Sequence, residues 1–209
     1  MKYRYVVVEG PIGAGKSTLA RLIAEHYDAD LVLEDPGANP FLPLFYRDMK
    51  RHALATQMFF LFQRVNQLSA LRQPDLFERK VAADYMLAKD RLFAKLTLDD
   101  NEFALYSQIY NHLQPQAPVP DLVIYLQTSV DQLMARIQRR GRPMEKGIGE
   151  EYMMRLNEAY TRHFYDYADS PLLIVNSDRF NFAENREHFQ LLLTRIESMR
   201  GMREYFNAG

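Results

Sequence analysis

The chain has 209 residues, of which 47% are apolar and 25% are charged, with a formal net charge of −1 and no cysteine. This balance is that of an ordinary globular protein with a full core, and it excludes disulfides and thiolate metal sites. Because overall basic charge is absent, we expect no nucleic-acid partner, and no apolar run approaches the ~20 residues of a membrane span. No charged-then-apolar leader precedes the first predicted strand, so we expect a cytoplasmic protein.

Short apolar stretches alternate with helical patterns along the chain. Strands are predicted at residues 5–8, 31–33, 81–83, 122–127 and 172–175. Helical periodicity is clearest over 54–68, 103–113 and 152–167, and Asp99 with Glu102 forms a capping-box pattern before the second of these. This alternation predicts an α/β fold, with a five-stranded parallel sheet covered by helices on both faces in a single domain over residues 1–209.

The first predicted strand runs into a glycine-rich turn that fits G-x-x-x-x-G-K-[ST] at every required position. Chance supplies this pattern at roughly 1 in 10,000 positions, which disfavours the alternative of a serine-capped turn. Lys16 is expected to reach the β- and γ-phosphates of a nucleotide, and the Ser17 hydroxyl to bind Mg²⁺. The predicted nucleotide-binding residues are Gly10, Pro11, Ile12, Gly13, Ala14, Gly15, Lys16, Ser17 and Thr18.

Two carboxylates follow predicted strands, at the sheet edge where ligands bind in such folds. Glu34 comes directly after the second strand and could accept the proton of an attacking hydroxyl. Asp84 ends the third strand, a position where P-loop proteins often have a metal-directed acid. A solvated loop acid or a turn carboxylate remains the alternative for each residue.

The helix predicted at 54–68 carries two polar residues of interest among its apolar positions. Gln57 and Arg64 are seven apart and therefore share a face. A glutamine side chain can donate and accept in one plane, which suits the edge of a nucleobase. From helical spacing alone, however, we expect Gln57 to be exposed.

Basic residues gather at the end of a later predicted helix, within residues 136–146. Gly141 is expected to end that helix. Cations at a helix C-terminus are favourable on dipole grounds alone, and the "RGRP" sequence could also suggest nucleic-acid binding. The concentration of arginines exceeds what capping needs, so we favour an arginine-rich lid over about 136–149 that meets the charge of a transferring phosphoryl group. The cations are Arg136, Arg139, Arg140, Arg142 and Lys146.

Together these motifs resemble the deoxynucleoside kinase family, which has a P-loop nucleoside kinase fold and phosphorylates the 5′-hydroxyl of deoxynucleosides. "EGPIGAGKST" is similar to its phosphate loop, "LEDPGANPFLPLFY" to the segment that carries its catalytic base, and "RIQRRGRPMEKGI" to its lid. The resemblance implies ATP as the phosphoryl donor, Mg²⁺, a small-molecule deoxynucleoside acceptor and a homodimer.

The resemblance also assigns roles in acceptor binding to individual residues. It implies that Glu34 is the base, that Tyr46 bonds the sugar 3′-hydroxyl and that Glu145 contacts the sugar. It further implies that Gln57 pairs with the nucleobase, with Arg64 near the same edge.

Other roles concern the donor and the lid. Arg136, Arg140 and Arg142 correspond to the R-x-x-x-R-G-R run of the family's lid, and are expected to meet the developing charge. The segment "NSDRFNF" is similar to the loop that holds the donor adenine, which implicates Asn181 and Phe182.

The chain departs from the family after the third strand. Many members have Glu-Arg-Ser there, whereas this chain has Asp84 followed by Tyr85. Tyr85 cannot supply the arginine's charge, and Lys89 or Arg91 are the candidates to replace it. The sequence here resembles bacterial members that act on deoxyadenosine or deoxyguanosine, and Asp90 aligns with the family's base-side aspartate.

The sequence therefore predicts ATP-dependent phosphorylation of a deoxynucleoside in nucleotide salvage, with purines favoured. One alternative is a nucleoside monophosphate kinase resembling the thymidylate enzymes. Such an enzyme must bind the phosphate of its acceptor, for which an arginine is expected near the end of the second strand. This chain has "EDPGANP" there, which disfavours this alternative. The other alternative is a non-kinase P-loop NTPase, which would hydrolyse nucleotide without an acceptor.

Overall fold

The structure is a computed structural model that describes residues 2–70, 79–114, 117–178 and 180–207. Within these ranges, six parallel strands form one sheet in the order β2-β3-β1-β4-β5-β6. All five predicted strands are confirmed, and a sixth at the edge was not predicted. The strands are β1 Tyr5–Glu9, β2 Asp30–Val32, β3 Val81–Ala83, β4 Leu122–Gln127, β5 Leu172–Asn176 and β6 Arg203–Phe206.

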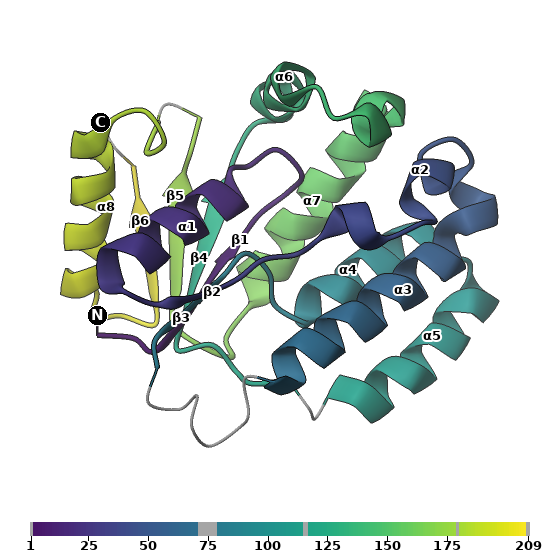
Figure 1. Cartoon of the computed structure of the whole chain (residues 1–209), viewed down its shortest axis with the longest axis horizontal. Coiled ribbons are helices and arrows are strands. Elements are labelled where there is room, and N and C mark those ends of the chain that lie inside the picture. Colours follow the sequence, from purple (N-terminus) through teal and green to yellow (C-terminus); the bar gives the residue numbers. More distant parts are fainter. Residues whose placement is uncertain (1, 71–78, 115–116, 179, 208–209) are drawn as a thin grey trace.

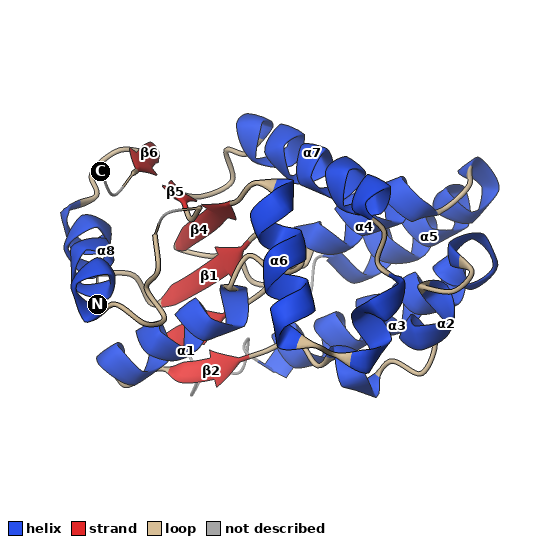
Figure 2. Cartoon of the chain, turned by 90° about the horizontal axis from the view of Figure 1, so that it is seen from above, coloured by secondary structure: helices blue, strands red, loops and turns tan. Residues whose placement is uncertain are grey.

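Helices cover both faces of this sheet, as Figures 1 and 2 show. Helices α1 (Lys16–Tyr27) and α8 (Arg186–Ser198) lie on one side. The other side carries α4, α7 and, further out, α3 and α5. In the described part of the chain, no helix is long and apolar enough to cross a membrane. The remaining bounds are α2 Leu42–Phe45, α3 Met49–Ala70, α4 Ala88–Thr97, α5 Asp100–Leu113, α6 Val130–Arg140 and α7 Glu150–Asp166, with short 3₁₀ turns η1 Pro36–Ala38 and η4 Pro143–Gly147.

The central strands appear in the sequence as continuous apolar runs because helices bury them on both faces. Every residue of β1 is buried, and in β4 only the last residue is exposed. The Tyr125 ring of β4 stacks on Phe164 of α7 with 4.4 Å between ring centroids. Strand β6 has the sequence Arg-Glu-Tyr-Phe and no fully buried residue. Strand β6 lies at the edge of the sheet, pairs with β5 alone among the described strands and lacks the apolar run by which the other strands were predicted. The prediction of five strands was therefore wrong.

The carboxyl ends of the three strands β1, β2 and β3 meet because β3 lies between the other two. The turn of residues 10–15 follows β1, Glu34 follows shortly after β2, and Asp84 follows β3. Helix α6 and the turn η4 lie above this edge (Figure 1), and Gly141 ends α6 in a left-handed conformation, as predicted. The sheet thus brings the predicted phosphate loop, base, metal-directed acid and lid to one place.

Candidate active site

The turn of residues 10–15, called the phosphate loop below, has at several positions a backbone conformation that residues with a side chain rarely adopt. Gly13 and Gly15 have φ of 89° and 100°. A Cβ at Gly13 would lie 2.9 Å from the backbone oxygen of Leu133. The loop is therefore held in one compact shape, and its end leads directly into the N-terminus of α1, where backbone N–H groups favour an anion.

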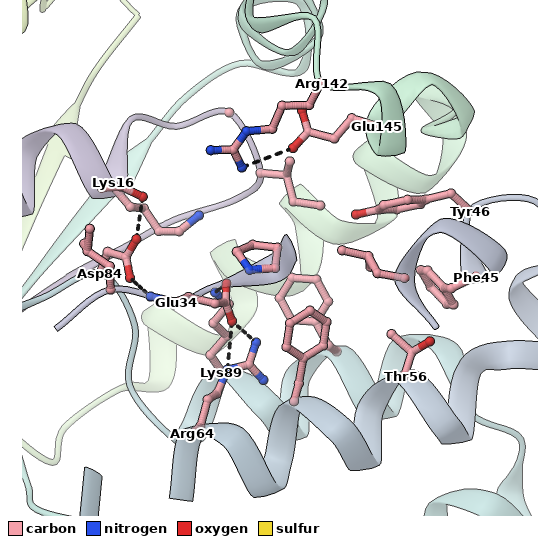
Figure 3. A pocket seen from close by; sticks show the side chains of 18 of the residues that line it. Lys16, Glu34, Phe45, Tyr46, Thr56, Arg64, Asp84, Lys89, Arg142 and Glu145 are labelled. Carbon is pink, nitrogen blue, oxygen red and sulfur yellow. Dashed lines mark hydrogen bonds and ion pairs between the residues drawn. The ribbon is translucent and has the colours of Figure 1, made fainter. Parts of the chain in front are cut away.

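A cavity, called the main cavity below, lies between the phosphate loop, α3 and the lid (Figure 3). Charged groups line the side nearest the loop, and aromatic and amide groups line the side formed by α2 and α3. Its walls include Lys16, Ser17, Glu34, Tyr46, Thr56, Gln57, Phe60, Arg64, Asp84, Lys89, Phe93, Arg140, Arg142, Glu145 and Tyr152.

Lys16 lies across the phosphate loop, and its Nζ donates to the backbone oxygen of Pro11 at 3.0 Å. Burial and, after it, repulsion from the nearby Lys89 cation lower the pKa of Lys16 to about 8. The ammonium is therefore largely charged at neutral pH, and an anion in the phosphate loop would stabilise that charge further.

Ser17 and Asp84 meet at the mouth of the loop. The Ser17 hydroxyl donates to Oδ2 of Asp84, while the backbone N–H of Glu34 donates to Oδ1 at 2.8 Å. The two hydrogen bonds fix the Asp84 carboxylate between α1 and the segment after β2. Hard oxygen donors of this kind suit Mg²⁺, which usually binds through one or two protein oxygens together with phosphate oxygens and water.

The Glu34 carboxylate faces the main cavity with its side chain 13% exposed, and two cations hold it (Figure 3). Arg64 donates to Oε1 through Nη2 and, at 2.9 Å, through Nε. Lys89 Nζ lies 2.9 Å from Oε2. Burial alone would raise the pKa of the Glu34 carboxyl, but the Arg64 and Lys89 charges outweigh it and hold that pKa far below its usual range. Glu34 is thus ionised and fixed in orientation.

Asp90 lies behind this pair rather than on the cavity wall. Its Oδ2 is 2.6 Å from Nη1 of Arg64, and its side chain is completely buried. The guanidinium of Arg64 also stacks over the Phe60 ring at 4.8 Å. Arg64 therefore bridges two carboxylates, and Asp90 contacts Arg64 where the resemblance implied a role beside the nucleobase.

Gln57 and Thr56 are the polar side chains of α3 in the middle of the main cavity wall. Gln57 is 3% exposed, so the expectation of an exposed residue was wrong, because α3 packs its Gln57 face against α4. The Gln57 amide donates to Thr97 Oγ1 at 3.3 Å, and the buried Thr56 hydroxyl has no hydrogen-bond partner among the described residues. An amide beside aromatic rings suits a flat heterocycle with polar edges.

The lid contributes Glu145, which is buried, together with the half-exposed Arg140 and Arg142. Arg140 donates to both oxygens of Glu145, at 2.5 and 3.1 Å, and Arg142 lies 3.8 Å away. The lid also rests on Tyr46, since a Cβ at Gly147 would lie 2.7 Å from the Tyr46 backbone oxygen. Tyr46 and Glu145 thus come together at the side of the main cavity away from Asp84 (Figure 3).

Arg136 is turned away from the main cavity and toward the phosphate loop. Its guanidinium donates to the backbone oxygens of Ala14, at 3.3 Å, and Ser177, at 2.6 Å. It lines a second groove with Asn181 and Phe182, on the other side of the loop. Phe182 is buried against Gly15, where an added Cβ would lie 3.1 Å from its ring. The predicted adenine-loop residues therefore adjoin the phosphate loop.

Sequence reasoning missed Glu9, the last residue of β1. Its fully buried carboxylate accepts from the backbone N–H groups of Gly10 and Met86 at 3.1 and 3.0 Å, and from the Tyr160 hydroxyl at 3.3 Å. Burial raises its pKa. The one signal in the sequence was an acidic residue at the end of an otherwise apolar strand. Glu9 ties the base of the phosphate loop to α7 and to the segment after β3.

An oriented carboxylate and an anion-binding loop share one cavity, and a lid of arginines adjoins both. This arrangement can transfer a phosphoryl group from a nucleotide in the loop to a hydroxyl beside the carboxylate. The fold and the site therefore define a P-loop phosphotransferase.

The family model described as Deoxynucleoside kinase matches residues 6–199. The chain belongs to the deoxynucleoside kinase family and is a phosphotransferase, as its sequence predicted.

Relatives match nearly the whole chain. A deoxyguanosine kinase of Bacillus subtilis is 32% identical over 93% of this chain and 97% of its own length. A deoxyadenosine kinase of Lactobacillus acidophilus is 32% identical over 92% of this chain and 94% of its own. The solved structure of a deoxyadenosine kinase from M. mycoides with bound dATP is 27% identical, with a TM-score of 0.78, and the match covers 92% of this chain and 99% of that chain.

Proposed function

We propose that this deoxynucleoside kinase transfers the γ-phosphoryl group of ATP to the 5′-hydroxyl of a purine deoxynucleoside in nucleotide salvage. The observation that carries the proposal is the placement of Glu34, ionised and held by Arg64 and Lys89, on the same cavity as Lys16 and Ser17. The purine preference rests on the deoxyguanosine and deoxyadenosine kinases among the relatives.

Glu34 acts as the base in this proposal. Its carboxylate orients the 5′-hydroxyl toward the phosphorus and accepts the proton as the new P–O bond forms. A low pKa is compatible with this role, because the loose transition state of phosphoryl transfer requires little deprotonation early in the reaction. Fixed orientation, supplied by the two cations, is then the larger part of its contribution.

Positively charged side chains on both sides of the main cavity stabilise the negative charge of the transferred phosphoryl group. Lys16 holds the β- and γ-phosphates, and Arg140 and Arg142 approach from the lid. Ser17 and Asp84 would hold Mg²⁺, which neutralises phosphate charge when bound. Arg136 keeps the phosphate loop in place through Ala14. Closure of the lid excludes water, which would otherwise receive the phosphoryl group.

The acceptor occupies the remainder of the main cavity. Tyr46 and Glu145 bind the sugar, and Gln57 binds the nucleobase between the aromatic rings of the wall. Asn181 and Phe182 in the second groove bind the adenine of the donor. Asp90 does not touch the acceptor in this proposal; it forms an ion pair with Arg64 and so keeps Arg64 in position beside Glu34.

We further propose that the enzyme is a cytoplasmic homodimer. The absence of cysteine among 209 residues supports a reducing compartment. Large apolar side chains remain exposed on α3 and α5, where they could contact a second subunit: Phe62 of α3 is 47% exposed and Leu105 of α5 is 50% exposed. Analytical ultracentrifugation of the wild type and of a Phe62→Ser/Leu105→Ser double variant tests the dimer.

The deciding experiment is a panel of the four natural deoxynucleosides with ATP and Mg²⁺, followed by identification of the products. We expect 5′-monophosphates, formed fastest from deoxyadenosine or deoxyguanosine. Faster phosphorylation of deoxyadenosine monophosphate than of deoxyadenosine would contradict the proposal in favour of a nucleoside monophosphate kinase. ATP hydrolysis at the full rate without an acceptor would contradict it in favour of an NTPase.

A further inference from the structure

The two oxygens of Glu34 are differently occupied. Oε1 accepts two hydrogen bonds from Arg64, so its lone pairs are used. Among the residues that the structure describes, Oε2 accepts only from Lys89 Nζ, at 2.9 Å. A hydroxyl that gives its proton to Glu34 must therefore approach Oε2, which places it beside the Lys89 ammonium.

Lys89 lies beside Glu34 on the wall of the main cavity. Its side chain is 4% exposed, passes over the Phe93 ring at 5.8 Å, and lines the main cavity together with Lys16. The two ammonium groups are close enough to repel each other appreciably. Figure 3 shows Lys89 below Glu34 and Lys16 above it, at the phosphate loop.

Two residues near Lys89 in the sequence, Tyr85 and Arg91, do not line the main cavity. The Tyr85 hydroxyl is directed away, to Oε1 of Gln67 at 2.6 Å, and its ring is fully buried. Arg91, two positions after Lys89 on α4, is exposed and lines a different surface groove with Arg155 and Glu158. Lys89 is the cation that α4 contributes to the main cavity.

We propose that Lys89 is a catalytic residue that pairs with Glu34 Oε2 and then turns to an equatorial oxygen of the transferring phosphoryl group. This proposal rests on the phosphoryl transfer proposed above. The O5′–H proton goes to Glu34 Oε2, the O5′–P bond forms, and the bond from the γ-phosphorus to its bridging oxygen breaks, leaving its electron pair on ADP. Lys89 keeps its three protons and acts by charge alone.

The chemistry of lysine suits this shared role better than arginine would. An ammonium on a flexible four-carbon stem is a point charge with three rotatable donors, so it can contact a carboxylate and a phosphoryl oxygen together. As Lys89 moves its charge toward phosphate, it withdraws some stabilisation from the Glu34 carboxylate. Glu34 thereby becomes a better proton acceptor at the point in the reaction when the proton is released.

The test compares Lys89→Met, Lys89→Gln and Lys89→Arg with Arg91→Gln as the matched control on the same helix. We expect kcat to fall about 100- to 1,000-fold in the two neutral variants, as when one donor to a developing charge is removed. KM for deoxynucleoside and for ATP should change by less than about threefold, because the contact forms only in the transition state. Lys89→Arg should recover part of the loss, and Arg91→Gln should match wild type.

A transition-state analogue separates catalysis from positioning. ADP, aluminium fluoride and deoxyadenosine together mimic the transferring phosphoryl group, and their affinity can be measured by calorimetry. Lys89→Met should weaken this complex by about the same factor as kcat, while deoxyadenosine alone binds as it does to wild type. Thermal melting of the two neutral variants identifies any loss of folding, and the less perturbed one carries the comparison.

Three results would overturn the proposal while wild type remains an active deoxynucleoside kinase. They are near-wild-type kcat in both neutral variants, a raised KM with unchanged kcat, or unaltered affinity for the aluminium fluoride complex. A wild type that phosphorylates no deoxynucleoside would instead overturn the proposed function itself, and the role of Lys89 with it.

Discussion

The backbone N–H of Glu34 donates a 2.8 Å hydrogen bond to Oδ1 of Asp84, which links the segment after β2 to the end of β3. The other oxygen of Asp84 accepts from Ser17 at the start of α1. The candidate metal-binding acid therefore also fixes the backbone of the candidate base. Substitutions can separate these two functions, because an amide oxygen can still accept the bond from Glu34 but carries no charge.

Asp84→Asn should raise the Mg²⁺ concentration needed for half-maximal activity by about 10- to 100-fold while the protein remains folded. The reason is that the variant retains the acceptor for the Glu34 N–H and loses the carboxylate that suits Mg²⁺. Titration of activity with Mg²⁺ at saturating ATP measures the effect. The control is Asp100→Asn, an exposed carboxylate in the first turn of α5. An unchanged Mg²⁺ requirement in Asp84→Asn would remove Asp84 from the metal site.

Glu34→Gln tests the base directly. We expect kcat to fall roughly 100- to 10,000-fold, the usual range for loss of general-base help, with deoxynucleoside affinity nearly intact. Steady-state kinetics and equilibrium binding give the two quantities. The neighbouring Asp35 provides the control, since its carboxylate caps η1 by accepting from Gly37 at 3.0 Å and does not line the main cavity. Turnover near the wild-type rate would exclude Glu34 as the base.

The part of the site that the sequence predicted well is local. The phosphate loop, the strands on either side of β1 and the capping box of Asp99 with Glu102 each depend on residues within a few positions of one another. These local patterns predict the backbone conformation directly, because glycine allows positive φ and apolar runs indicate strands. The capping box is confirmed, with bonds of 3.2 and 2.9 Å.

Charge pairing inside the site could not be predicted in the same way. Arg64 is 30 positions from Glu34 and Lys89 is 55 positions from it, and nothing local in the sequence distinguishes Lys89 from Arg91. Burial of Gln57 and Asp90 depends on how α3 packs against α4. The periodicity of one helix does not predict this contact with another helix. Only the packing of these helices places cations beside Glu34.

ATP binding should depend on pH through Lys16. Its pKa of about 8 in the protein without nucleotide means that the ammonium is present below that pH and lost above it. The dissociation constant of ATP should therefore be nearly constant below about pH 8 and rise by up to about tenfold per pH unit above it. Calorimetry without acceptor measures this dependence. Lys16→Arg keeps its charge and should flatten the curve, whereas a flat wild-type curve up to pH 9.5 would contradict the assignment.

Asp90→Asn distinguishes a supporting role for Asp90 from contact with the nucleobase. Asp90 is completely buried with its Oδ2 2.6 Å from Arg64, so loss of its charge leaves Glu34 as the carboxylate that still pairs with the guanidinium. We expect the free energy of unfolding in urea to fall by about 3 kcal/mol, the lower end of the cost of breaking a buried ion pair, because Glu34 still compensates Arg64. The control, Glu158→Gln, breaks an exposed pair with Arg162 and should change stability by less than about 0.5 kcal/mol. Unchanged stability together with an altered preference among deoxynucleosides would show instead that Asp90 acts on the base.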